Sequence, residues 1–187
     1  MVKQRKQMAV LLLILFAACG VLGFVSLSSK EEAEAMAEEG FVVNDIEADE
    51  ATKLIFTNST GTYSLRKEEE KWILEEDKTA EVDETEVTRL LAAVAPLRSA
   101  DRIEQAEDLS LYGLDSPVRT IMVSNSEKNS TILVGDFNEI TDTYYICLEE
   151  DTSTVYTAEY DTVSAFEVQT EDLIIEPDEE ETTEEAE

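Results

Sequence analysis

Histidine is absent from this 187-residue sequence, and cysteine, glycine, proline and tryptophan are scarce. Without histidine the chain lacks the usual general base near neutral pH and the commonest metal ligand. Serine triads, Cys/His dyads and zinc sites of the histidine type are therefore excluded. The six glycines are scattered singly, so the sequence contains no glycine-rich phosphate loop. We accordingly predict a protein that is not an enzyme and that has no cofactor and no metal site.

Positive charge is also scarce. The chain has 14 Lys and Arg against 44 Asp and Glu, which gives a formal net charge of -30. Such a charge repels phosphate backbones and anionic lipid surfaces, so nucleic acid is not an expected partner. The length allows one compact domain of about 100 to 150 residues with appendages, and not a second full domain.

The two cysteines do not form a disulfide framework. Cys19 lies inside an apolar run, whereas Cys147 lies far along the chain in a strand-like segment. An internal disulfide is not expected, so the hydrophobic core must hold the fold together.

A long apolar run stands near the N-terminus, after a basic segment that contains Lys3, Arg5 and Lys6. The uncharged stretch 8–25 would extend roughly 27 Å as a helix, which just spans the apolar core of a bilayer. We predict a transmembrane segment over residues 8–27. Residues 1–7 are then cytoplasmic and the remaining chain is extracytoplasmic, because basic flanking residues stay on the cytoplasmic side.

Three interpretations of this segment remain open. The run is longer than the apolar region of a signal peptide, about 7 to 15 residues, which favours a single-pass signal anchor. The sequence FAAC resembles a lipobox in which Cys19 would be lipidated after cleavage, although Phe16 and the apolar residues after Cys19 fit that pattern poorly. A cleaved and freely secreted product is the third interpretation.

Two acidic segments flank the middle of the chain. Residues 28–43 are rich in Glu and Ala and predict a solvated stalk. Residues 176–187 (EPDEEETTEEAE) are almost wholly acidic and predict a disordered tail. Between them, residues 44–175 have the pattern of a folded α+β domain, antiparallel and rich in strands, with one or two packed helices.

The strand pattern occurs in two runs that resemble each other. The first run predicts a three-stranded meander followed by a helix, and the second predicts four strands followed by a short helix at 159–166. We therefore predict an internal β-β-β-α repeat. The expected strands are 52–57, 62–67 and 71–75 in the first run, and 118–124, 130–136, 143–150 and 153–158 in the second.

The first helix has clear boundaries. Asp83 can cap its first turn, and Glu86, three residues later, completes a capping box. Pro96 ends the helix at about Ala95, because proline disfavours helical backbone in the residue before it. One face is apolar and is expected to lie on the sheet, with Val87, Leu90, Leu91 and Val94 at helical spacing.

The stretch LSLYGLDSP, 109–117, joins the two runs. We predict a helical turn over 106–112 that ends at Gly113 in the left-handed conformation, with Leu114 packing back on Leu109. Pro117 holds the residue before it extended and so starts the next strand. Without a histidine to activate its serine, the stretch is interpreted as a turn and not as a catalytic site.

Three groups of side chains deserve consideration as sites. Trp72, Tyr144 and Tyr145 could form a recognition surface, although aromatic residues of amphipathic strands usually pack in the core. Carboxylates are numerous enough to allow an acid/base pair. In GDFNEITD the oxygen ligands expected of a calcium loop are interrupted at Ile140 and Thr141, so a surface turn is predicted there.

The order of these motifs resembles the bacterial family called domain of unknown function 4340, over about residues 45–166. Its most specific parts are Tyr112-Gly113-Leu114 with Pro117, Lys71-Trp72, and Val134-Gly135-Asp136. The resemblance implies a protein held at the membrane by an N-terminal helix, with no catalytic residues established. It also implies encoding beside ABC-type transport components, of the kind associated with gliding motility.

These observations lead to one main hypothesis on function. We expect a non-enzymatic, extracytoplasmic accessory or interaction domain, anchored in the cell membrane by a single pass. Its expected partner is a permease or auxiliary subunit of an ABC-type transport system. The alternatives are a cell-envelope ligand-binding module, a lipoprotein lipidated at Cys19 with the same domain, and an envelope hydrolase that uses paired carboxylates.

Overall fold

The computed structural model describes residues 40–175, and the chain divides into two units, 1–40 and 41–187. The predicted basic N-terminus, transmembrane segment and acidic tail lie outside the described residues, as does most of the predicted stalk. Within residues 40–175 no helix is both long and apolar enough to cross a membrane.

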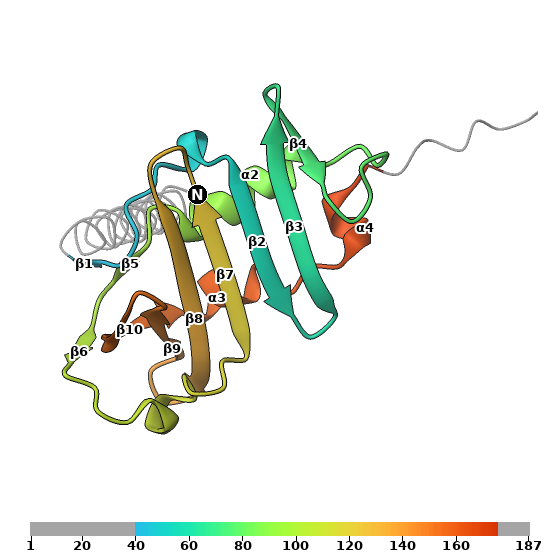
Figure 1. Cartoon of the computed structure of the whole chain (residues 1–187). Coiled ribbons are helices and arrows are strands. Elements are labelled where there is room, and N and C mark those ends of the chain that lie inside the picture. The colour runs from blue at the N-terminus through green and yellow to red at the C-terminus, as the bar shows by residue number, and fades with distance from the viewer. Residues whose placement is uncertain (1–39, 176–187) are drawn as a thin grey trace, which may run out of the picture. The chain divides into compact units, whose positions relative to one another are not determined.

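An eight-stranded antiparallel sheet dominates the described domain (Figure 1). Its strands follow the order β4-β3-β2-β7-β8-β9-β10-β6, and each pair of neighbours is antiparallel. The predicted strand-rich, antiparallel α+β architecture is therefore confirmed. The strands are β2 (Lys53–Asn58), β3 (Gly61–Glu68), β4 (Lys71–Leu74), β6 (Arg102–Glu104), β7 (Arg119–Ser124), β8 (Asn129–Asn138), β9 (Thr143–Leu148) and β10 (Asp151–Glu159).

Two meanders meet at the centre of this sheet. The strands β2 to β4 form one meander and β7 to β10 form the other, and β2 pairs with β7, with Ile55 opposite Met122. Each meander is followed by a helix, namely α2 (Glu84–Val94) after the first and α3 (Tyr160–Ser164) after the second. The predicted element order is thus present in both halves. A repeat at the level of the sequence stays a prediction.

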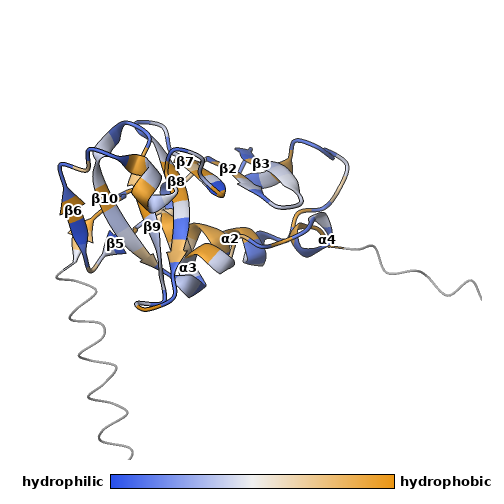
Figure 2. Ribbon diagram, turned by 90° about the horizontal axis from the view of Figure 1, so that it is seen from below, coloured by the Kyte–Doolittle hydropathy of each residue, from blue (hydrophilic) through white to orange (hydrophobic). Residues whose placement is uncertain are grey.

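The helices α2, α3 and α4 (Thr170–Leu173) lie on one side of the sheet, as Figure 2 shows. The predicted apolar face of α2 is buried, and it joins a core to which the inward-facing residues of the strands contribute. Burying these side chains stabilises the fold by roughly 1.5 to 3 kcal/mol each. The largest fully buried side chains include Phe56, Phe166, Ile46, Leu54, Leu65, Leu74 and Leu90.

The start of α2 agrees with the prediction in part. The Asp83 side chain accepts hydrogen bonds from the amides of Thr85 and Glu86, so Asp83 is the cap. The predicted capping box is wrong, however, because the backbone N–H of Asp83 donates to the carbonyl of Leu173 and not to the side chain of Glu86. The carboxylate of Glu86 binds the guanidinium of Arg89. The helix ends at Ala95, as expected.

Asn58 connects the β2–β3 turn with the link between α3 and α4. Its Nδ2 donates to the carbonyls of Phe166 and Val168, at 2.9 and 2.8 Å, in the link between α3 and α4. Its Oδ1 accepts from the backbone N–H groups of Thr60 and Gly61 in the β2–β3 turn. One side chain therefore fixes a hairpin turn and a distant connection at the same time.

Several short elements of the structure were not predicted from the sequence. They are β1 (Phe41–Val42), which pairs with β5 (Arg98–Ser99), the edge strand β6, and the 3₁₀ turn η1 (Ala48–Glu50). Two or three residues are too few to show an alternating pattern. The strand β1 lies at the end of the segment that the sequence assigns to the stalk, and Val43 directly after it is buried.

The second face of the sheet is covered over only half of its width. The segment 106–114, which includes the 3₁₀ turn η2 (Leu109–Tyr112), packs on β8, β9 and β10 in a small cluster around Leu114, Cys147 and Val155. In Figure 1 no other described element lies in front of β2, β3 and β7. We call the uncovered surface of these strands and β4 the open face.

Candidate functional site

The stretch 109–117 is a structural junction. Gly113 adopts the left-handed conformation, with φ at 68°, at the end of η2. The N–H of Leu114 donates to the carbonyl of Leu109, and the two side chains pack in the same cluster, as predicted. The turn is shorter than expected, because Asp108 caps it through the amide of Ser110, and so it begins at Leu109 and not at 106.

Two glycine motifs of the sequence meet at this junction. A Cβ atom at Gly135 would stand 2.0 Å from the carbonyl oxygen of Tyr112. A Cβ atom at Gly113 would stand 2.4 Å from Oδ1 of Asp136 and 2.8 Å from its backbone nitrogen. Both glycines are therefore required for backbone to approach backbone. The motifs around Gly113 and Gly135 hold η2 against β8, which is a role in folding.

The only cysteine among the described residues lies beneath this junction. Cys147 is fully buried in the cluster that Leu114 covers. Burial, together with the nearby carboxylate of Asp151, raises the pKa of its thiol to about 11. Because the thiolate is the reactive form, this thiol is inert near neutral pH.

The three aromatic residues proposed as a recognition surface do not converge. Trp72 packs against the main core on β4, at one edge of the sheet. Tyr144 and Tyr145 are neighbours on β9, so their rings point to opposite faces. Tyr144 packs with the main core, whereas Tyr145 stacks edge-on with Tyr112 in the small cluster. The prediction that these three residues form one recognition surface is therefore wrong.

A different aromatic group is partly open to solvent. Phe137 contacts Tyr144 and Tyr160, with ring centroids at 4.9 and 5.7 Å. Phe137 is 36% exposed and Tyr160 is 42% exposed. A hollow of about 260 Å³ lies next to Tyr160, between the β8–β9 turn and the start of α3. This group could not be predicted from the sequence, because it joins strand residues with a helix whose position the sequence does not reveal.

The acidic stretch 136–142 contains the predicted turn, which spans residues 139–142 after the end of β8 at Asn138. The side chain of Asn138 accepts from the amide of Ile140 and donates to the hydroxyl of Tyr145. The amide of Asp142 donates to the carbonyl of Asn138, and Asp142 has a left-handed φ of 58°. Over residues 40–175 no group of three or more metal-ligating side chains comes together.

Several carboxylates are held in their ionised form by hydrogen bonds. The side chain of Lys128 lowers the pKa of Asp45, and the guanidinium of Arg66 lowers that of Glu75. Neighbouring hydroxyl groups do the same elsewhere, since hydrogen bonds from Thr79, Ser110 and Ser153 lower the pKa of Asp77, Asp108 and Asp151. A general acid at neutral pH needs a raised pKa, so these five groups are suited to turns and ion pairs.

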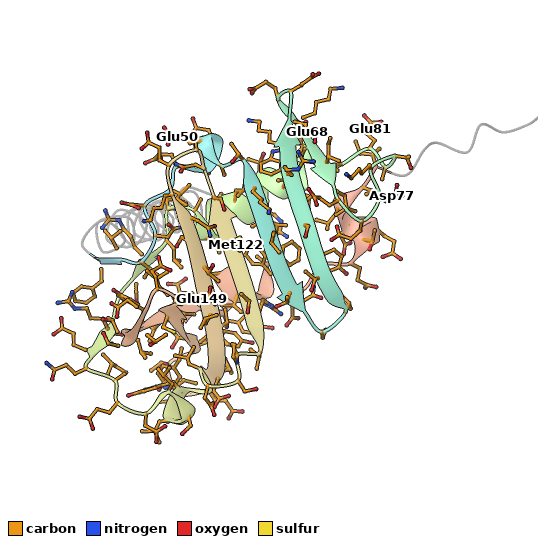
Figure 3. The ribbon with its side chains drawn as sticks, viewed as in Figure 1. Glu50, Glu68, Asp77, Glu81, Met122 and Glu149 are labelled. Atoms are coloured by element: carbon orange, nitrogen blue, oxygen red, sulfur yellow. The ribbon has the colours of Figure 1, made fainter. Side chains whose placement is uncertain are left out.

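A large hollow lies beside β4. It has a volume of about 1190 Å³ and lies between the β3–β4 turn, β4 itself and the chain that leads into α2. Carboxylates dominate its lining, and Figure 3 shows Glu68 at the β3–β4 end and Glu81 beyond β4. The lining residues are Glu68, Glu69, Lys71, Trp72, Ile73, Ala80, Glu81, Val82, Asp83, Glu84, Thr85 and Ile175. We call this hollow the β4 groove.

These features define a two-layer α+β domain whose distinctive glycines and capping residues serve its fold. The chain belongs to the family described as Domain of unknown function (DUF4340), whose sequence profile matches residues 26–117 and 72–177. No curated protein and no solved structure matches the chain. The two matches overlap, and each of them takes in strands from only part of the continuous sheet.

Proposed function

We propose that this chain is a membrane-anchored, extracytoplasmic accessory domain that binds another protein of an ABC-type membrane transport system. The observation that carries the proposal is the open face. Its residues alternate with core residues on the same strands, so their side chains point away from the helices. Half-buried apolar side chains on this face, at Ile55, Ile73 and Met122, have no covering layer among residues 40–175.

The open face has the composition of a protein-binding surface. Met122 lies across from Ile55, with Ser64 beyond Ile55, so one row of this face mixes apolar and hydroxyl side chains. Figure 3 shows Met122 near the middle of the whole sheet, on β7, where the open face borders the covered half. Methionine is common on surfaces that adapt to partners. Interfaces between separate proteins combine apolar and polar groups in this way.

The anchor and the transport partner rest on other support. The uncharged run at 8–25 with its basic flank supports a single membrane pass with the N-terminus in the cytoplasm. The resemblance of the motifs supports a place beside ABC-type transport components. An accessory role needs no catalytic group, which agrees with the prediction that the chain is not an enzyme.

Photo-crosslinking in native membranes tests the proposal. A photoreactive amino acid replaces Met122 on the open face, and a matched variant carries it at Thr88, which is exposed on α2. The expected result is a crosslinked membrane transport component from the Met122 position and none from the Thr88 position. Recovery of the protein alone from both positions, at native expression levels, would overturn the proposal.

A cell-envelope ligand is the second candidate, and the exposed rings of Phe137 and Tyr160 favour it. Aromatic faces beside a hollow stack well on sugar rings, and this hollow has hydroxyl and carboxylate groups at Thr141, Asp142 and Asp161. Tyr160→Ala should abolish retention of the protein on purified cell-wall polymer. Unchanged retention, or none by the wild type, would rule this candidate out.

A further inference from the structure

The strand β4 leaves part of its backbone at the edge of the sheet. The amide of Glu75 donates to the carbonyl of Ser64 in the neighbouring strand. Because hydrogen bonding alternates along an antiparallel pair, Ile73 also faces β3 and Trp72 faces away from it. Beyond β4 the described residues add only an isolated bridge between Leu74 and Asp77. The N–H and C=O of Trp72 therefore point outward from the sheet.

The β4 groove lies along this edge. Its volume of about 1190 Å³ exceeds the roughly 300 to 1,000 Å³ that pockets for small ligands occupy. Trp72 is part of its lining and is half-buried, so one side of the ring rests on the core while the rest borders the groove. An extended peptide segment suits a hollow of this volume beside a sheet edge, because it can continue the hydrogen-bond ladder.

The groove is negatively charged. Five carboxylates line it against one ammonium, that of Lys71, and Asp83 among them is engaged in capping α2. The positive end of the α2 dipole offsets only a fraction of this charge. A Lys or Arg side chain would find both carboxylates and the face of Trp72, which attracts cations. The charge therefore favours a basic segment and repels an acidic one.

The β3–β4 turn keeps acidic residues where the backbone disfavours them. Glu69 and Glu70 are the two central residues of this hairpin turn, and their φ angles are 47° and 71°. Such turns favour Asn-Gly, because a residue with a Cβ atom is strained in the left-handed region. The ion pair of Glu70 with Lys67 is exposed and contributes little to stability. The carboxylates of this turn are better explained by binding than by folding.

We propose that the free edge of β4 binds an extended, Lys- and Arg-bearing segment of a partner protein, which adds to the sheet as a further strand. The backbone of the segment pairs with Trp72, and its basic side chains reach the carboxylates of the β4 groove and the ring of Trp72. This inference rests on the proposed function, and it specifies where one partner segment binds and what its chemistry is.

Binding of synthetic peptides to the full chain tests the inference. Trp72 is the single tryptophan of the sequence, so its fluorescence reports on this site alone. The probe is a ten-residue peptide of alternating Lys and Val. Two control peptides replace Lys by Glu or methylate alternate backbone nitrogens. The expected result is saturable binding of the first peptide, weakened by salt, with at least a tenfold loss for either control. Equal binding of the methylated peptide would overturn the addition of a strand.

Paired variants separate binding from folding. Glu69→Asn with Glu70→Gly removes one carboxylate that lines the β4 groove and the one next to it in the turn, and it relieves the strained turn. The affinity should therefore fall about three- to tenfold while the melting temperature rises. The matched control is Glu149→Gln with Glu150→Gln, which removes two exposed carboxylates from the β9–β10 turn and should leave the affinity unchanged. An unchanged affinity in the first variant, or an equal loss in the control, would overturn the inference.

The crosslinking experiment distinguishes failure of this inference from failure of the proposed function. A partner that is crosslinked from Met122 while the basic peptide does not bind would refute the β4 site and leave the proposed function standing. A peptide that binds while no partner is crosslinked from Met122 or Thr88 would overturn the proposed function, which rests on the open face, and would leave the binding of a basic segment at the β4 edge standing by itself.

Discussion

The contact between Gly135 and Tyr112 allows a quantitative test of the junction that holds η2 on the sheet. In Gly135→Ala the new methyl group would lie 2.0 Å from a carbonyl oxygen, whereas ordinary contacts begin near 3.4 Å. The carbonyl of Tyr112 must then retreat by roughly 1.4 Å, and as a backbone atom it cannot simply rotate away. Overpacking costs about 1 to 3 kcal/mol, so we expect the upper end of that range. The melting temperature should fall by roughly 10 °C.

The same substitution should expose Cys147. The junction covers this thiol, so its displacement should accelerate alkylation of Cys147 by N-ethylmaleimide, measured for the Cys147 peptide by mass spectrometry. Gly113→Ala disturbs the same junction through a different contact, with Asp136, and adds the cost of a left-handed alanine, about 1 to 2 kcal/mol. Because both changes displace η2, the double variant should lose at least about 1 kcal/mol less than the sum. Strict additivity, or a wild-type melting curve for Gly135→Ala, would refute the reasoning.

Three further predictions concern single side chains. Asn58→Asp replaces the amide donor by a carboxylate beside two carbonyls, and urea unfolding should show a loss of about 2 to 4 kcal/mol, with Thr57→Ser nearby as a mild control. Asp83→Ala removes the cap of α2 and should cost about 1 kcal/mol, whereas Asp83→Ser should keep most of it. Burial raises the pKa of Cys147 to about 11, so the native state holds this proton more tightly than the unfolded chain. The free energy of unfolding that this protonated thiol contributes is complete below about pH 8.5 and is lost as the pH rises towards 11. In Cys147→Ala the free energy of unfolding should therefore depend less on pH over this range.

The strands of both meanders could be predicted because their signal is local. Residues such as Leu54 and Phe56 alternate with polar neighbours, and a strand with one buried face must show this period of two. The same holds for α2, whose buried residues recur at helical spacing. The pairing of β2 with β7 could not be predicted, because no turn joins these strands and many other pairings would bury the same residues.

The sequence alone was sufficient to exclude one part of the predicted aromatic surface. Tyr144 and Tyr145 are consecutive in a strand, so they cannot share a face, whatever the fold. The position of Trp72 could not be predicted from the sequence, since only the strand order shows that β4 stands at an edge of the sheet. The β4 groove depends on that order and on the path of residues 80–85, which pass beside the edge strand. Neither the strand order nor the path of residues 80–85 produces a local pattern in the sequence.

The central pairing of β2 with β7 has a consequence for synthesis of the chain. The first meander and α2 leave the ribosome well before β7, since Asn58 ends β2 and Ser124 ends β7. Since the chain is synthesised at about 5 to 20 residues per second, the edge of β2 that pairs with β7 stays unpaired for roughly 3 to 13 s. During that time Leu54 and Phe56 lack part of the core that later buries them. Until β7 is added to the sheet, the first meander therefore has an unpaired strand edge and incompletely buried apolar side chains, which are the features that make a partly folded chain prone to aggregation.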